Sequence, residues 1–220
     1  MTKKSFGSPF ICYDAYMELT TNSNGYLNKT ALGYMINTFL SSSTRQEIKG
    51  LQDKFTANFP DLVWCTPPNT LHVTLMDWLA PLVDYSEDKD ALFDDLFPVY
   101  DEALNRILNE TPPVHLTFSR LIVSPSAIAV IADENSTKIV NDIRQRFLSE
   151  IKLLPNTKQP PSIVHCTIAR FTGKIAGNDI QNIADSIEFS FGETIGCFQL
   201  VRETQVPMME YSIIKRYSLI

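Results

Sequence analysis

Cysteine is scarce in this chain of 220 residues, and its four copies lie far apart, as Cys12, Cys65, Cys166 and Cys197. They form no CxxC pair and no short framework of the kind that staples small secreted domains. A structural metal site would need clustered cysteine and histidine ligands, and the sequence contains no such cluster. We therefore predict free thiols, no metal and a cytoplasmic protein.

Long apolar runs are also missing. No stretch reaches the roughly 18 apolar residues that a membrane-spanning helix requires, so we expect no membrane partner. The start, MTKKSFGSPF, has two lysines but lacks the apolar core of a signal peptide. Repeats, low-complexity tracts and an obvious linker are absent as well, which predicts a single domain over residues 1–220.

Basic residues are fewer than acidic ones. The chain has 19 Lys and Arg residues and 25 Asp and Glu residues, which gives a net charge of −6. Long duplex nucleic acid needs a basic surface, so it is not an expected partner, whereas a small anion needs only a few local positive groups. Residues 84–102 hold eight acids and one base, Lys89, which leaves +1 for the rest of the chain. We interpret this stretch as a solvated acidic loop leading into a helix face rather than as a partner site.

Strand and helix patterns are mixed along the chain. Strand patterns occupy residues 10–20, 62–65, 71–79, 114–119, 127–132, 163–171, 197–203 and 211–219, while residues 31–40 fit a strand or a short helix. Helix patterns occupy residues 44–58, where Thr44 and Glu47 form a capping box, and residues 99–108, 136–148 and 178–186. Hairpins without a βαβ run predict the α+β class.

All three histidines occur in the same four-residue pattern, as His72-Val-Thr74-Leu, His115-Leu-Thr117-Phe and His165-Cys-Thr167-Ile. One such tetrad would mean little, but every histidine of the chain has it. Side chains alternate along a strand, so histidine and threonine two residues apart face the same side while the residue between them faces the core. Each strand would therefore present an imidazole beside a hydroxyl.

Two such strands facing one cleft would place two imidazoles about one phosphate. A neutral histidine can remove a proton from water or a hydroxyl, and a protonated one can give a proton to the departing oxygen. Histidine has a free pKa near 6.5, so it can take either role near neutral pH. Threonine hydroxyls can donate to non-bridging phosphate oxygens. The pattern therefore suits phosphodiester cleavage without a metal or other cofactor.

The segments LHVTLMDWL and VHCTIARF resemble the paired motifs of the 2H phosphoesterase superfamily, which includes the bacterial RNA 2′,5′-ligase-like proteins and cyclic nucleotide phosphodiesterases. Ala169-Arg170 is similar to the usual continuation of the second motif. The ending FQLVRETQVPMMEYSIIKRYSLI resembles the closing strand pair, with Arg202 and Tyr211 in familiar places. The resemblance covers roughly residues 60–220, and residues 1–60 look like an extended N-terminal region.

The resemblance implies a bilobal α+β fold, in which two pseudo-symmetric antiparallel sheets line a central cleft and the helices lie outside. Motif 1 at residues 72–75 and motif 2 at residues 165–168 would come from different halves. The implied catalytic pair is His72 and His165, with Thr74 and Thr167 on the phosphate. Two further residues, Arg170 and Tyr211, are candidate substrate contacts.

Several assignments have competing interpretations. In a regular strand Arg170 would face away from His165, so it is either a surface charge or a substrate contact. Tyr211 either lines the cleft or fills the core. We expect His115 to be an ordinary strand-face residue and Cys166 to face away from the cleft.

The leading functional prediction is a hydrolase that cleaves a 2′,3′-cyclic phosphate or a 2′,5′-phosphodiester of a nucleotide or short RNA. Two alternatives stay open. The cleft could bind a nucleotide or an RNA end without cleaving it, or the protein could process or ligate RNA ends as other members of the superfamily do. A basic track beside the cleft would favour the latter.

Overall fold

Apolar and β-branched runs in the sequence form strands of two antiparallel sheets in the computed structural model, which describes residues 18–19 and 25–220. The first sheet, ordered β11-β10-β2-β4, contains β2 (Thr30–Phe39), β4 (His72–Leu79), β10 (Cys197–Gln205) and β11 (Glu210–Ser218). The second, ordered β3-β7-β6-β5-β9, contains β3 (Val63–Cys65), β5 (Val114–Val123), β6 (Ala127–Ala132), β7 (His165–Phe171) and β9 (Phe191–Ile195). A short pair joins β1 (Glu18–Leu19) to β8 (Ile175–Ala176).

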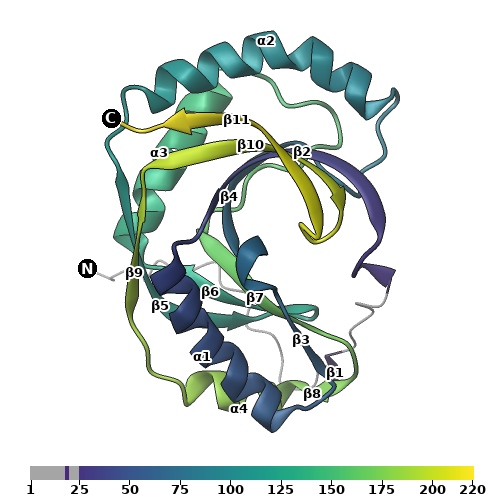
Figure 1. Cartoon of the computed structure of the whole chain (residues 1–220), viewed down its shortest axis with the longest axis vertical. Coiled ribbons are helices and arrows are strands. Elements are labelled where there is room, and N and C mark those ends of the chain that lie inside the picture. The colour runs from purple at the N-terminus through teal and green to yellow at the C-terminus, as the bar shows by residue number, and fades with distance from the viewer. Residues whose placement is uncertain (1–17, 20–24) are drawn as a thin grey trace, which may run out of the picture.

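The first sheet curls strongly, and the helices lie on the outside of both sheets (Figure 1). The described residues form α1 (Ser42–Asn58), α2 (Lys89–Leu108), α3 (Glu134–Glu150) and α4 (Gly177–Asp185), with a 3-10 turn at Pro68–Thr70. Helix α2 contacts β11, β2 and α3, whereas α1 and α4 contact strands of the second sheet. The predicted α+β class and the two-sheet architecture are confirmed. None of the helices in the described ranges is long and apolar enough to cross a membrane.

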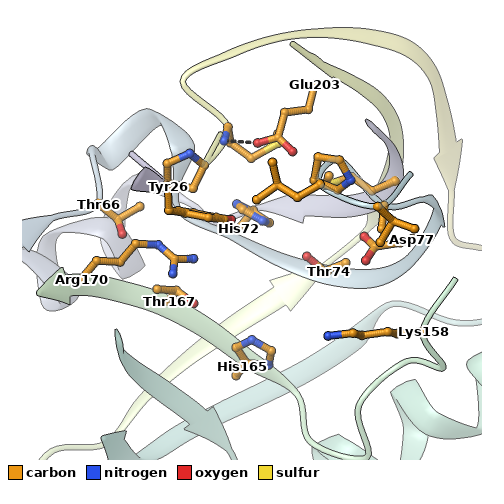
Figure 2. A pocket seen from close by; sticks show the side chains of 17 residues that line it. Tyr26, Thr66, His72, Thr74, Asp77, Lys158, His165, Thr167, Arg170 and Glu203 are labelled. Carbon is orange, nitrogen blue, oxygen red and sulfur yellow. Dashed lines mark hydrogen bonds between the residues drawn. The ribbon is translucent and has the colours of Figure 1, made fainter. Parts of the chain in front are cut away.

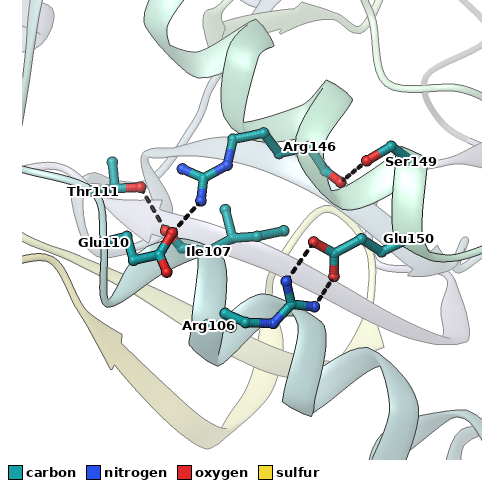
Figure 3. Close-up of polar contacts among 7 residues, drawn as sticks. All are labelled: Arg106, Ile107, Glu110, Thr111, Arg146, Ser149 and Glu150. Carbon is teal, nitrogen blue, oxygen red and sulfur yellow. Dashed lines mark hydrogen bonds and ion pairs between the residues drawn. The ribbon is translucent and has the colours of Figure 1, made fainter.

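Aromatic packing joins α2 and α3 to the first sheet. The fully buried ring of Trp78 lies 5.2 Å from Tyr100 and 6.4 Å from Phe147, measured between centroids. Burying such side chains contributes roughly 1.5–3 kcal/mol each. On the surface, Arg106 pairs with Glu150 across the same two helices (Figure 3). An exposed ion pair contributes only about 0–1 kcal/mol, so the apolar contacts hold the helices in place.

Residues 25–60 supply integral parts of the fold. Residues 31–40, which fitted a strand or a helix, belong to β2, and β2 lies between β10 and β4. The predicted cap of the next helix was wrong, because α1 begins earlier. Ser41 is its N-cap, with Oγ accepting a hydrogen bond from the Thr44 amide at 3.4 Å and donating one to the buried Glu193 at 2.9 Å. The strand predicted at residues 10–20 lies mostly outside the described residues.

The acidic segment, residues 84–102, is an exposed loop that leads into a helix, as expected, but the carboxylates of its helical part do not all face solvent. Helix α2 begins within it, and two of its carboxylates bind the neighbouring sheet. Asp90 pairs with Arg202 of β10 at 3.0 Å, and Asp101 pairs with Lys215 of β11 at 2.6 Å. Part of the local negative charge is therefore balanced by the first sheet.

Candidate active site

Strands β4 and β7, one from each main sheet, turn polar side chains toward one cavity of about 410 Å³ (Figure 2). His72 and Thr74 on β4 and His165 and Thr167 on β7 all line it. The residues between each pair are buried on the opposite side. The structure therefore brings together the four residues that the sequence singled out, two from each strand.

Both strands contain an irregularity at the same place. Leu75 of β4 lacks a partner in β2 and Ile168 of β7 lacks one in β6, so each is an extra residue that shifts the alternation by one. As a result the side chain five residues after each histidine returns to the cavity side. That residue is Asp77 on β4 and Arg170 on β7. Arg170 would face away from His165 only in a regular strand, and the bulge in β7 instead places it on the cavity side.

Buried side chains bind the carbonyl groups at both irregularities. Arg144 of α3 donates to the carbonyl oxygens of Leu75 and Thr74, at 2.8 Å each. Gln52 of α1 donates to the carbonyl oxygen of Ile168 at 2.8 Å. A buried carbonyl that leaves the sheet ladder needs another partner, so these two side chains stabilise the bulges that direct residues 77 and 170 into the cavity.

The ring of His72 is held in a defined state. Its Nδ1 lies 2.7 Å from the carbonyl oxygen of Thr70. A carbonyl oxygen only accepts hydrogen bonds, so Nδ1 carries the hydrogen and the neutral ring has its lone pair on Nε2. Burial lowers the pKa of His72, while the Thr70 carbonyl acts in the opposite direction by favouring the protonated ring. Figure 2 shows the ring lying in the cavity between Tyr26 and Thr74.

His165 lies on the other wall of the cavity. Burial lowers its pKa to about 4, and the neighbouring charges of His72, Arg144 and Arg170 add to this shift. Within the described residues its ring makes no hydrogen bond, so nothing local favours the protonated form. At neutral pH His165 is therefore a neutral imidazole.

One end of the cavity is cationic and aromatic. The guanidinium carbon of Arg170 lies 4.4 Å from the centroid of the Tyr26 ring, a distance typical of a cation–π contact. Its Nε is buried and has no hydrogen-bond partner among the described residues, and the same holds for the hydroxyl of Thr66 beside it. Unused donors next to a positive charge are suited to bind an anion.

The other side of the cavity contains two carboxyl groups. Glu203 of β10 accepts a short hydrogen bond from the Met208 amide, whereas Asp77 has no hydrogen-bond partner in the described part of the chain. Burial raises the pKa of Asp77 to about 6 and that of Glu203 to about 7. Lys158 lines the same side without an ion pair to either carboxylate.

The remaining sequence candidates lie away from the cavity. His115 is exposed on β5, where Nδ1 lies 2.9 Å from the Thr194 hydroxyl, as expected for a strand-face residue. Cys166 is buried in the core, which confirms that it faces away from the cleft. Tyr211 packs on Phe39, with 5.0 Å between the ring centroids, and does not line the cavity.

Three residues that the sequence did not single out also line the cavity, namely Asp77, Tyr26 and Glu203. The sequence does contain a signal for Asp77, because HVTLMD and HCTIAR both place a charged residue five positions after the histidine. Tyr26 and Glu203 come from distant segments, and no local pattern connects them to either motif. Among residues 18–19 and 25–220, no three His, Cys, Asp or Glu side chains are grouped so that they could hold a metal ion.

No family model matches the sequence, and no curated protein matches it. Solved structures do match. TT0787 of Thermus thermophilus has a TM-score of 0.61 at 18% identity over 85% of this chain and 97% of its own. LigT of E. coli has a TM-score of 0.55 at 13% identity, and the match covers 87% of this chain and 99% of LigT. A protein described as a phosphoesterase has a TM-score of 0.53 at 16% identity, with coverage of 87% of this chain and 99% of its own.

The chain has the fold of the 2H phosphoesterases. Structures of LigT include complexes with 3′-AMP and with NADP+. In this chain the 2H-phosphoesterase fold combines two neutral imidazoles, two hydroxyls and one guanidinium in a single cavity. Such a set of groups can bind a phosphate, remove a proton on one side of it and supply a proton on the other.

Proposed function

We propose that this chain is a 2H-type phosphodiesterase that hydrolyses a 2′,3′-cyclic phosphate or a 2′,5′-phosphodiester of a nucleotide or short RNA. The observation that supports this most directly is the convergence of two histidine–threonine pairs, from two different strands, on one cavity. Either histidine alone would be an ordinary strand residue. Together with the unpaired Nε donor and the positive charge of Arg170 they form a set suited to a phosphodiester.

In the proposed reaction, His165 acts as the base and His72 as the acid. The Nε2 of His165 takes a proton from water, the water oxygen forms a bond to phosphorus, and the bond to the leaving oxygen breaks. The protonated Nε2 of His72 then gives its proton to that oxygen. The assignment is supported by the Thr70 carbonyl, which accepts from Nδ1 of His72 and favours its imidazolium, whereas His165 has no such partner. A bound phosphate anion would raise the pKa of both rings.

The hydroxyls of Thr74 and Thr167 would donate to the two non-bridging oxygens and stabilise the charge that grows there in the transition state. Arg170 would hold the anion from the end of the cavity, with its plane fixed against Tyr26. A nucleotide is the proposed ligand class because LigT, which shares the fold, binds 3′-AMP and NADP+.

The test is a screen in the presence of a chelator against 2′,3′-cyclic nucleotides, 3′,5′-cyclic nucleotides and 2′,5′-oligoadenylate, with phosphorus NMR to identify the bond that breaks. We expect turnover of 2′,3′-cyclic or 2′,5′-linked substrates by the wild type. Tight binding without product over hours would instead support a binding module. Turnover only of long RNA, with steep salt dependence, would support an RNA end-processing protein.

A further inference from the structure

We propose that Asp77 selects the nucleobase, and that it favours guanine by accepting hydrogen bonds from the two adjacent donors of its Watson–Crick edge. This inference rests on the proposed function, since it assumes a nucleotide whose phosphate lies between the two histidines. It adds a specificity-determining residue that makes no contact with the phosphate.

The position of Asp77 along β4 suits this role. Because of the bulge at Leu75, His72, Thr74 and Asp77 follow one another on the cavity side of the strand. Successive same-face residues are about 7 Å apart, so Asp77 lies roughly that distance beyond the proposed phosphate contact at Thr74. One nucleoside spans such a distance between its phosphate and the edge of its base. Figure 2 shows Asp77 and Arg170 on opposite sides of the cavity.

The carboxylate of Asp77 is unused within the protein. A partly buried carboxylate normally has a hydrogen-bond partner, because desolvation without one costs free energy. Glu203 has such a partner in the Met208 amide, but Asp77 has none among the described residues. With its pKa raised by burial to about 6, Asp77 is ionised at pH 7.5 and can only accept hydrogen bonds.

An apolar wall adjoins this carboxylate. Pro81, Leu82 and Val83, which follow β4, line the cavity, and Leu82 is 42% exposed. A nucleobase has two apolar faces and a polar edge, so a site for one needs apolar contacts beside a directional polar group. Asp77 and these three side chains together meet that requirement.

The same wall is held rigidly from behind. The ammonium group of Lys89 donates to the carbonyl oxygens of Ala80 and Pro81, at 2.9 and 2.8 Å. Pro81 also packs on Gly33 of β2, where an added Cβ would lie 2.9 Å from the proline. Sites held by such supporting contacts lose little entropy when a ligand binds.

Guanine is the base that matches an ionised carboxylate. Its Watson–Crick edge presents two neighbouring donors, N1–H and N2–H, which can bind both carboxylate oxygens. None of the Watson–Crick edges of adenine, cytosine and uracil has two neighbouring donors, so an acceptor of these bases would face a negative oxygen. A good bidentate contact discriminates between bases by about tenfold to a hundredfold.

The experiment compares kcat/KM for the four nucleoside 2′,3′-cyclic phosphates in the wild type, Asp77→Asn and a control, Asp84→Asn. The control removes one exposed negative charge close to the wall without touching the cavity. We expect the wild type to favour guanosine over each other base by at least about tenfold. An asparagine presents one acceptor and one donor, and the Watson–Crick edge of every base offers a matching pair, so Asp77→Asn should lose the guanosine preference while Asp84→Asn keeps it.

The deciding measurement is the ratio of kcat/KM between substrates with different bases. Removing a negative charge raises the affinity for every anionic substrate alike and so leaves this ratio unchanged. Equal kcat/KM for all four bases in the wild type would overturn the proposal. The proposal would also be overturned if Asp77→Asn changed kcat/KM for all four substrates by the same factor. Asp77 would then act on the ribose or on the cavity as a whole.

The failure of the proposed function is a separate result. If the wild type turns over none of the four substrates, calorimetry of the same variants with the 3′-monophosphates of the four nucleosides decides the question of the base. A guanosine preference that disappears in Asp77→Asn supports base selection in a binding module. Equal affinity for the four ligands contradicts base selection there too.

Discussion

The two halves of the cavity are built alike but end in opposite charges. Strands β4 and β7 have the same order of histidine, threonine and bulge, and each bulge is held by a buried side chain from a helix. Five residues after the histidine, however, β4 has Asp77 and β7 has Arg170. The two histidine–threonine pairs can contact the two sides of a phosphate in the same way. Asp77 and Arg170 have opposite charges, so they must contact chemically different ends of a substrate.

The difference between Asp77 and Arg170 shows how a pseudo-symmetric scaffold can bind an asymmetric ligand. Repetition places the groups for acid and base chemistry at matching positions, which suits a reaction that needs one of each. A change at one position per half is then sufficient to orient the substrate. Mutations at equivalent positions of the two halves therefore test which features are shared and which are not.

The largest effects are expected at the histidines. His72→Ala and His165→Ala should each lower kcat for nucleotide substrates by at least about a thousandfold, while His115→Ala keeps most of the activity. With a nitrophenyl phosphodiester, whose leaving group needs no proton, His72→Ala should regain more activity than His165→Ala. Steady-state kinetics on both substrate types provides the measurement, and equal recovery would reject the assignment of acid and base.

The next effect concerns stability. Arg144 donates hydrogen bonds to Leu75, Thr74, Pro161, Ile163 and Asn141, whereas Gln52 donates to Ile168 and Thr66. We expect Arg144→Met to lower the free energy of unfolding by about 3 kcal/mol or more, and Gln52→Met by about 1–3 kcal/mol.

Urea unfolding of both variants measures this difference. Arg144→Lys is the matched control, because it retains a positive charge but lacks the fork that binds several carbonyl groups at once. It should remain destabilised. Full stability in Arg144→Lys would mean that the charge, rather than the hydrogen-bond geometry, supports β4.

A smaller and symmetric loss is expected at the two threonines. Thr74→Val and Thr167→Val should each lower kcat by about tenfold to a hundredfold, because each removes one donor to a phosphate oxygen without changing the shape of the side chain. Serine at either position should restore most of the activity. A loss confined to one strand would show that the phosphate lies against that strand alone.

The smallest effect is the dependence of stability on pH that Asp77 contributes to the β4 half. Burial raises the pKa of Asp77 from 3.8 to about 6, so the folded state disfavours its ionised form. Well below pH 4 both the folded and unfolded states hold the proton, and Asp77→Asn should equal the wild type in stability. Between pH 4 and 6 the variant should become more stable, and by pH 8 the difference should reach about 1–3 kcal/mol.

Urea unfolding of the wild type and Asp77→Asn at pH 4, 6 and 8 gives this comparison. The expected gain at high pH follows from removing a charge that has no partner. A variant that is less stable than the wild type at pH 8 would contradict the view that Asp77 is unpaired in the folded protein.

Much of the fold could be predicted from local patterns. The alternation in VHLTFS and the apolar spacing around Ile48 predicted β5 and α1 because these signals depend on neighbouring residues. Strand β9 was missed, since its inward residue Glu193 is polar. That carboxylate is buried against the amide and hydroxyl of Ser41, at 2.8 and 2.9 Å, a contact between segments 152 residues apart.

The sequence alone determined the two motifs, because the chemistry of an imidazole and a hydroxyl on one face of a strand depends only on a spacing of two residues. The tertiary structure decided which other groups join them. Arg170 and Asp77 reach the cavity only through bulges stabilised by Gln52 and Arg144, and those contacts exist only after distant helices have packed. Local spacing therefore predicts the reacting groups, whereas long-range packing determines the groups proposed to orient the substrate.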